Sequence, residues 1–227
     1  MASGIEHGPE SAERRIVTGL SRIGLALRSI MWAKGQASGL TPTQAQILSA
    51  LDRRGPLRVS AIATDLGVRQ PTATEAVNAL VRKGYVGKAL DPKDRRAVIL
   101  TLTGQGQAAA SRAAAWPEAM LGAVGELDQA EKAAVLRALM KMIRSLQERR
   151  EIAPSRICVT CRYFHPHVHA DPKAPHHCAF VNAPFGDGEL RTDCAEHEPA
   201  PVEQARLAWQ RFAKGAETSG QAAEGRP

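Results

Sequence analysis

The four cysteines of this 227-residue chain are confined to one short segment near its C-terminal end. They are Cys158, Cys161, Cys178 and Cys194. Six of the seven histidines lie in the same stretch, between Cys158 and His197. In a reducing cytoplasm, clustered thiols are more often metal ligands or redox groups than a disulfide framework. The distribution predicts two parts: a cysteine-free domain and a small, loop-rich C-terminal module whose cysteines hold a metal or an iron-sulfur cluster.

The N-terminal sequence and the net charge indicate where the protein is located and which kind of partner it binds. The N-terminal residues MASGIEHGPESAERR contain no apolar run behind a basic stretch, and the chain has no run of about 18 apolar residues. We therefore expect no secretion signal, no membrane span and a cytoplasmic location. The formal net charge is +7. A basic surface attracts polyanions through the release of counterions, so nucleic acid is the expected partner.

The first part of the chain has the pattern of packed helices. Between residues 11 and 37, apolar residues recur at alternating spacings of four and three, a heptad seam typical of helix-helix packing. The seam consists of Ile16, Leu20, Ile23, Leu27 and Ile30. A second helix is expected from Pro42 to about Arg53, where Thr41 and Gln44 can form a capping box.

A helix-turn-helix candidate and a hairpin follow. Short helices over residues 60–67 and 69–84, joined by a turn, match the helix-turn-helix pattern. Next, YVGKAL, the turn DPKDRR and AVILTLT predict an antiparallel hairpin with five charged residues at its tip. Such a basic hairpin beside a recognition helix is a wing. Residues 103–127 predict a helix broken or bent at Trp116-Pro117, and residues 128–150 predict a last long helix.

Residues 1–150 resemble the MarR family of bacterial winged helix-turn-helix transcription regulators. The resemblance lies in the order of the elements, the wing sequence DPKDRRAVILTLTGQG and the helix ending ALVRKGYV. It implies a mainly α-helical domain with a small β-hairpin wing, which forms a homodimer through its first and last helices. It also implies two recognition helices that read a pseudo-palindromic operator in double-stranded DNA, about one DNA turn apart.

The resemblance assigns DNA contacts to two groups of residues. Arg96, paired with Asp94, would enter the minor groove, while Arg95 and Lys93 would bind phosphates. Four side chains would face the major groove or its walls: Arg69, Gln70, Thr72 and Thr74. For any one of these four, a solvated helix surface is an equally good alternative. Glu75 stands where the family often has a basic residue, so it either accepts a hydrogen bond from a cytosine amino group or points away.

The cysteine segment is not part of the family pattern, so its role rests on its own chemistry. Cys158 and Cys161 form a CxxC pair, sixteen residues separate Cys161 from Cys178, and fifteen separate Cys178 from Cys194. On ligand number, four thiolates suit tetrahedral zinc and an iron-sulfur cluster equally. Structural zinc sites usually present two CxxC pairs, whereas here the second pair is split.

The residues around the cysteines favour the cluster. Four aromatic residues follow the ligands in the sequence: Tyr163, Phe164, Phe180 and Phe185. An apolar shell tunes and protects an iron-sulfur cluster. Over about forty residues the segment also resembles the cluster-binding pattern of high-potential iron-sulfur proteins. We therefore expect all four cysteines to bind a cluster of the [4Fe-4S] type, with a structural Zn2+ as the alternative.

The remaining features are less informative. The histidines of the segment could replace a thiolate or bind a second metal, although exposed loop positions are the simpler expectation. They are His165, His167, His169, His176, His177 and His197. The chain is thus divided into a regulator domain over 1–150, a cysteine segment over 151–200, a helix over 201–215 that docks through Trp209, and a disordered tail over 216–227.

These features predict a DNA-binding transcription regulator, expected to be a repressor, whose cluster senses redox state, oxygen or iron supply. One alternative is a MarR-type repressor that a small aromatic effector releases from DNA, with zinc as a passive brace. Another is an electron-transfer protein that uses its helix-turn-helix for protein contacts. Because the chain has no phosphate-binding glycine loop and no nucleophile motif, we expect it not to be an enzyme.

Overall fold

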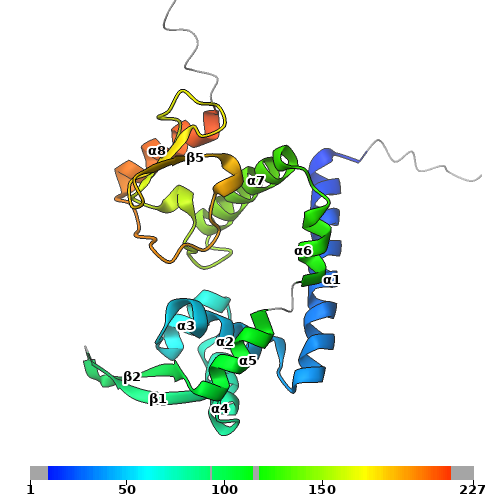
Figure 1. The fold of residues 1–227 in the computed structure, drawn as a ribbon, viewed down its shortest axis with the longest axis vertical. Coiled ribbons are helices and arrows are strands. Elements are labelled where there is room, and N and C mark those ends of the chain that lie inside the picture. The colour runs from blue at the N-terminus through cyan, green and yellow to red at the C-terminus, as the bar shows by residue number, and fades with distance from the viewer. Residues whose placement is uncertain (1–9, 93, 115–117, 216–227) are drawn as a thin grey trace, which may run out of the picture. The chain divides into compact units, whose positions relative to one another are not determined.

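The computed structural model describes residues 10–92, 94–114 and 118–215 (Figure 1). The chain divides into two compact units, each described by itself below. The first contains the described residues up to Arg58 together with Thr74–Gly122. The second contains Val59–Ala73 and the described residues from Ala123 onward. The tail over 216–227 and the predicted break at Trp116-Pro117 lie outside the described residues, so both stay predictions.

Helices and a two-stranded hairpin build the first unit. Its main elements are α1 (Ala12–Ser38), α2 (Pro42–Arg54), most of α4 (Gln70–Arg82), β1 (Val86–Asp91), β2 (Asp94–Leu102), α5 (Gly104–Ala114) and most of α6 (Glu118–Gly125). The capping box of α2 is confirmed: the Gln44 amide donates to the Thr41 hydroxyl, and the Thr41 amide donates to the Gln44 side chain. Six large side chains form the buried centre of this unit: Ile47, Leu48, Val77, Leu80, Val86 and Leu100.

The predicted wing is present as the antiparallel pair β1 and β2. The register runs from Val86 opposite Leu102 to Leu90 opposite Val98, and a bulge follows Leu90. Leu57 adds a short bridge to Leu100 on the other edge of β2. The hairpin is thereby attached to the helical body through main-chain hydrogen bonds as well as through its own turn.

The first helix leaves its apolar seam largely exposed. Ile16, Leu20 and Ile23 are exposed, and Leu27 and Ile30 are half-buried. By length and composition alone, Ala12–Gly35 could cross a membrane. However, Arg22 and Arg28 stand in the middle of this stretch, where a charge is costly in lipid. A long exposed stripe of this kind is also what a helix needs in order to pack on a second protein chain.

One glycine fixes how closely the wing approaches α5. A Cβ atom on Gly106 would overlap the backbone carbonyl oxygen of Tyr85, which immediately precedes β1. We expect Gly106→Ala to destabilise the first unit by about 1–3 kcal/mol, because backbone must shift to admit the methyl group. Urea unfolding followed by circular dichroism measures this, with Gly104→Ala as control because a Cβ there meets open space. Equal stability of the two variants would contradict the prediction.

The second unit combines helices with a small three-stranded sheet. Its elements are α3 (Val59–Leu66), α7 (Gln129–Glu148), the 3-10 turn η1 (Cys158–Thr160), β3 (Phe164–His165), β4 (His176–Cys178), β5 (Ala183–Phe185), the 3-10 turn η2 (Asp187–Glu189) and α8 (Val202–Lys214). The strands pair in the order β3-β4-β5 and are antiparallel. A capping box between Asp128 and Glu131 starts α7.

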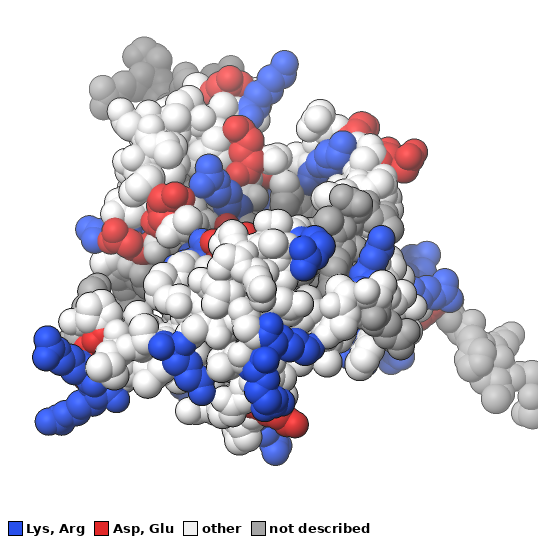
Figure 2. Space-filling view, turned by 60° about the horizontal axis from the view of Figure 1, so that its bottom comes forward, with Lys and Arg blue, Asp and Glu red and all other residues white. Residues whose placement is uncertain are grey.

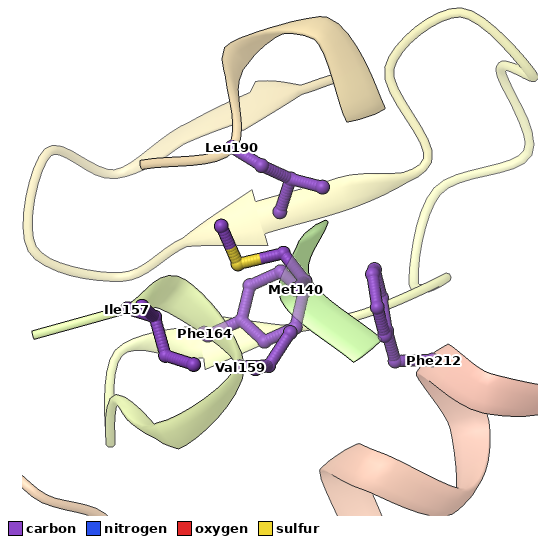
Figure 3. Packing of buried hydrophobic residues seen from close by; sticks show 6 residues of the cluster. All are labelled: Met140, Ile157, Val159, Phe164, Leu190 and Phe212. Atoms are coloured by element: carbon purple, nitrogen blue, oxygen red, sulfur yellow. The ribbon is translucent and has the colours of Figure 1, made fainter. Parts of the chain in front are cut away.

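The core of the second unit is made from pieces far apart in the sequence (Figure 3). Six residues form it: Met140 from α7, Phe212 from α8, and Ile157, Val159, Phe164 and Leu190 from the segment between these helices. Trp209 is only partly buried at its edge, whereas Phe212 is fully buried. The predicted helix is therefore present, but Phe212 and not Trp209 is its central anchor, because the ring of Phe212 contacts the aromatic rings of the sheet.

The helix α7 also holds α8 through polar contacts. The Arg137 guanidinium donates to the carbonyl oxygen of Phe212 at 2.8 Å and lies over the Phe212 ring, and the Lys141 ammonium reaches the carbonyl oxygen of Ala213 at 3.4 Å. Cations at the C-terminal end of a helix are favourable because the carbonyl groups there carry partial negative charge. The compact second unit thus includes α7, which lies before the predicted domain boundary at residue 150. Whether residues 1–150 fold alone stays a prediction.

Candidate functional site

The four cysteines line a single cavity of about 160 Å3 in the second unit. Cys158 begins the turn η1, and its carbonyl oxygen accepts a hydrogen bond from the Cys161 amide at 2.9 Å. This tight turn sets the two sulfur atoms of the CxxC pair on the same loop. Cys178 ends β4, and Cys194 lies in the turn beyond η2, where its amide donates to the carbonyl oxygen of Arg156 at 2.9 Å. Local backbone structure therefore positions each thiol.

The wall of the cavity is mostly apolar, as the sequence indicated. All four aromatic residues that follow the cysteines in the sequence contribute to it. The rings of Tyr163 and Phe180 meet edge to face at 5.5 Å, and the Tyr163 hydroxyl donates to Glu198 at 2.7 Å. Phe164 lines the cavity and also belongs to the core of the unit. Little polar surface other than the sulfur atoms faces the cavity, apart from Glu189, Arg191 and Glu196.

Arg191 contacts two of the four sulfur atoms. Its backbone amide donates to Cys158 Sγ at 3.2 Å, and its guanidinium Nη1 lies 3.8 Å from Cys194 Sγ. The same nitrogen is 3.4 Å from a Glu196 carboxylate oxygen, which accepts from the Cys194 thiol at 3.3 Å. The carbonyl oxygen of Arg191 accepts from the Cys158 amide at 3.1 Å. Nothing in the spacing of the cysteines pointed to Arg191, because it contains no ligand atom itself.

The raised pKa of the Cys158 thiol links metal binding to proton release. Burial raises the pKa of Cys158 to about 11, and the neighbouring thiols add to the rise. The thiol therefore keeps its proton at neutral pH when no cation is present. A bound metal must displace that proton, which couples metal binding to proton release.

Zinc and an iron-sulfur cluster require different arrangements of the four sulfur atoms. Tetrahedral zinc, with Zn–S bonds of about 2.3 Å, requires four sulfur atoms within about 4 Å of one another. Among the described residues, which include every cysteine, no three Cys, His, Asp or Glu side chains converge closely enough to hold one ion. A polynuclear cluster differs in that each cysteine binds a different iron atom, and which of the two groups the four thiols hold stays a prediction.

The six histidines of the segment do not line the cavity. Contrary to the expectation of exposed loop positions, His176 is fully buried. Its Nδ1 accepts from the His167 amide at 3.3 Å, and its Nε2 lies 2.9 Å from the Asp187 carboxylate. Because Nδ1 accepts, the proton is on Nε2 and is donated to Asp187. His176 is buried because it lies in β4 between the rings of Phe164 and Phe212.

The residues assigned to DNA lie on exposed surface. Arg69 precedes α4, and three further side chains occupy its first turns: Gln70, Thr72 and Thr74. Arg95 and Arg96 are exposed near the start of β2, while Lys93 lies outside the described residues. Glu75 is also exposed. Lys and Arg side chains outnumber Asp and Glu on the part of the surface that carries the wing (Figure 2).

The wing contains one contact that the sequence did not reveal. Asp94 contacts Arg96 by accepting from its backbone amide at 3.1 Å, and the role of Arg96 in the minor groove stays a prediction. The Asp94 carboxylate is also 3.3 Å from the guanidinium of Arg58, which pairs with Asp91 at 2.6 Å. Arg58 therefore joins the two strands of the wing near its turn. Its partners lie more than thirty residues away in sequence, which hid this contact.

The order of the elements defines the fold. The elements α2, α3, α4, β1 and β2 follow one another as in a winged helix-turn-helix. Residues 38–97 match the family model described as MarR family. The curated relatives that match are described as transcriptional regulators.

Two curated relatives come from Bacillus subtilis (strain 168). The HTH-type transcriptional repressor MdtR is 34% identical over 71 residues, which is 31% of this chain and 46% of MdtR. The uncharacterized HTH-type transcriptional regulator YcgE is 32% identical over 78 residues, which is 34% of this chain and 51% of YcgE. The chain thus spans about half the length of the curated relatives it matches.

Solved structures share the fold over a longer stretch. BpsR from Bordetella bronchiseptica, described as regulated in its DNA binding by 6-hydroxynicotinic acid, is 26% identical with a TM-score of 0.50. The match covers 60% of this chain and 97% of BpsR. FabT from Streptococcus pneumoniae, solved with DNA, is 22% identical with a TM-score of 0.53 and shows the fold alone, over 60% of this chain and 98% of FabT.

Proposed function

We propose that this chain is a cytoplasmic, DNA-binding transcription repressor whose C-terminal cysteines hold an iron-sulfur cluster, of the [4Fe-4S] type, that senses redox state, oxygen or iron supply. The observation that carries this proposal is the arrangement of all four cysteines around one apolar cavity in a chain with a MarR-family winged helix. Cys158, Cys161, Cys178 and Cys194 would hold the cluster. When bound, it would supply a centre that gains or loses an electron or is lost on oxidation.

Features of the first unit support the proposal that a homodimer binds double-stranded DNA. The exposed seam of α1 supplies an apolar face for a second copy of the chain. A homodimer would present two copies of α4 and of the wing to a pseudo-palindromic operator. Arg95 and Arg96 on the wing, with the exposed side chains at the start of α4, would make the contacts to phosphates and bases.

A physical route connects the cysteine cavity to α7. The guanidinium of Arg144, on α7, donates to the carbonyl oxygen of Val159 at 3.3 Å, and Val159 lies between the two cysteines of the CxxC pair. Met140 of α7 packs in the same core as Val159. A change in the conformation of η1 on cluster loss would therefore alter direct contacts with α7. The family resemblance places this helix in the dimer interface. Coupling of about 1–3 kcal/mol would change operator affinity roughly 5- to 150-fold.

The DNA-binding part is tested by a change on the wing. We expect Arg96→Ala to weaken operator binding by roughly 5- to 150-fold per half-site, because a specific arginine contact contributes about 1–3 kcal/mol. Fluorescence anisotropy with a labelled operator fragment, at fixed salt, gives the affinity. Arg112→Ala, which removes an exposed arginine on α5, is the matched control. If both variants bind equally well, Arg96 has no specific role.

A second candidate is a repressor that a small aromatic effector releases from DNA, with zinc as a structural brace of the cysteine segment. The similarity to BpsR, whose DNA binding is regulated by 6-hydroxynicotinic acid, favours it. Operator binding that responds to this aromatic acid but not to oxygen or chelators would support the second candidate against cluster sensing. An electron-transfer protein without DNA binding is disfavoured by the MarR-family match.

A further inference from the structure

Among the polar residues of the cavity wall, Arg191 is placed to act on the electronic state of the site. It approaches two cysteines in two different ways: its backbone amide contacts Cys158 Sγ at 3.2 Å, and its guanidinium contacts Cys194 Sγ at 3.8 Å. Hydrogen bonds to the ligand sulfur atoms and the net charge near a cluster are two of the factors that set its reduction potential.

The sign of the effect follows from electrostatics. Reduction adds one electron to a cluster and makes the site more negative. A guanidinium beside a ligand sulfur stabilises the more negative state, and therefore raises the reduction potential. The Arg191 side chain is 58% exposed, so water screens part of this interaction, although its hydrogen bond to sulfur is direct.

Glu196 makes the contribution of Arg191 larger. A Glu196 oxygen lies 3.3 Å from Cys194 Sγ and 3.4 Å from Arg191 Nη1. The arginine therefore neutralises a carboxylate that would otherwise place a negative charge next to a ligand sulfur. Removal of the guanidinium loses its own positive charge and leaves the Glu196 charge uncompensated, and both changes disfavour reduction.

We propose that Arg191 is the residue that raises the reduction potential of the cysteine site, and with it the redox condition to which the protein responds. The inference rests on the proposed cluster at Cys158, Cys161, Cys178 and Cys194. Arg191 is a positioning and tuning residue, because its own atoms ligate nothing. The tested step is the exchange of one electron between the cluster and an electrode through soluble mediators, in which no covalent bond forms or breaks.

The experiment compares Arg191→Gln with the full-length wild-type protein, both loaded with iron and sulfide under anaerobic conditions. We expect Arg191→Gln to shift the ratio of reduced to oxidised cluster at least tenfold toward the oxidised form at a fixed potential. For a one-electron couple this corresponds to a midpoint about 59 mV lower. Arg191→Lys keeps a positive charge and should shift the ratio less. Spectroelectrochemical titration gives the midpoint of each protein.

Arg162 offers a matched control. Its side chain is 53% exposed, it follows Cys161 in the sequence, and it pairs with Glu198 at 3.2 Å, but its guanidinium lies over the ring of Tyr163. Arg162→Gln removes the same charge from a similar surface position. An equal shift in Arg162→Gln and Arg191→Gln would overturn the specific role of Arg191, as would an unchanged midpoint in Arg191→Gln.

A second variant, expected to shift the reduction potential in the opposite direction, keeps the test informative if the arginine variant misfolds. Glu196→Gln removes the negative charge next to Cys194 and should shift the ratio toward the reduced form. If Glu196→Gln and Arg191→Gln both leave the midpoint of a loaded protein unchanged, the tuning inference is wrong although the cluster exists. If the wild-type protein binds neither iron nor sulfide, the proposed function itself is wrong and the tuning inference is lost with it.

Discussion

Replacing Cys158 with serine should reduce the iron and sulfide content of the anaerobically purified protein to background and remove absorbance near roughly 400 nm. Cys158 begins the turn η1 and lines the cavity with the other three cysteines, so its loss would leave one iron position of the proposed cluster without a protein ligand. Serine preserves the size of the side chain, and the module should remain folded. Iron, sulfide and zinc analysis with an absorption spectrum makes the measurement.

The same variant tests sensing. We expect Cys158→Ser to bind the operator with the affinity of cluster-free wild-type protein, roughly 5- to 150-fold different from the loaded protein. Thr160→Ser changes a residue of the same turn without touching a thiol and should behave as wild type. Loaded wild-type protein and Cys158→Ser with equal operator affinity would refute sensing. Colourless wild-type protein with one zinc per chain would instead make the cysteine segment a structural site.

The second large effect is expected in the core of the cysteine module. Phe212→Ala should lower the free energy of unfolding of the second unit by about 3–5 kcal/mol, because it removes a large buried side chain and leaves a cavity. The Phe212 ring is 0% exposed, lies 5.7 Å from the rings of Phe164 and His176, and carries the Arg137 guanidinium above it at 4.9 Å.

Denaturant unfolding followed by near-ultraviolet circular dichroism measures this loss, because the affected unit contains most of the aromatic contacts. Val202→Ala, at the start of the same helix and 88% exposed, is the control and should change stability by less than about 0.5 kcal/mol. A loss in Phe212→Ala no larger than in Val202→Ala would show that α8 does not complete this core.

The features that sequence reasoning predicted well are local ones. Thr41 and Gln44 cap α2 because both partners lie within one turn, and the wing forms between strands joined by a short turn. The gathering of the four cysteines around one cavity was also predicted, because no cysteine occurs elsewhere in the chain. In each case a short stretch of sequence, or a rare residue type, is enough to predict the feature.

The features that were missed depend on contacts between distant residues. His176 was expected on the surface, yet Phe164 and Phe212 enclose it from different elements. Arg58 stabilises the wing from a position more than thirty residues away. Arg191 contacts two sulfur atoms, but no periodicity or motif distinguishes it from other exposed arginines. Such contacts follow from the tertiary fold, and one sequence does not specify which distant residues meet.

The core around Phe164 has a consequence for how the module is made. Its side chains come from α7, from the cysteine loops and from α8, so a peptide of residues 151–200 would lack Met140 and Phe212. A version of the module that keeps this core must therefore include at least residues 129 to 215. During synthesis, α8 is the last of these pieces to leave the ribosome, so the core is completed only after the cysteine loops have been translated.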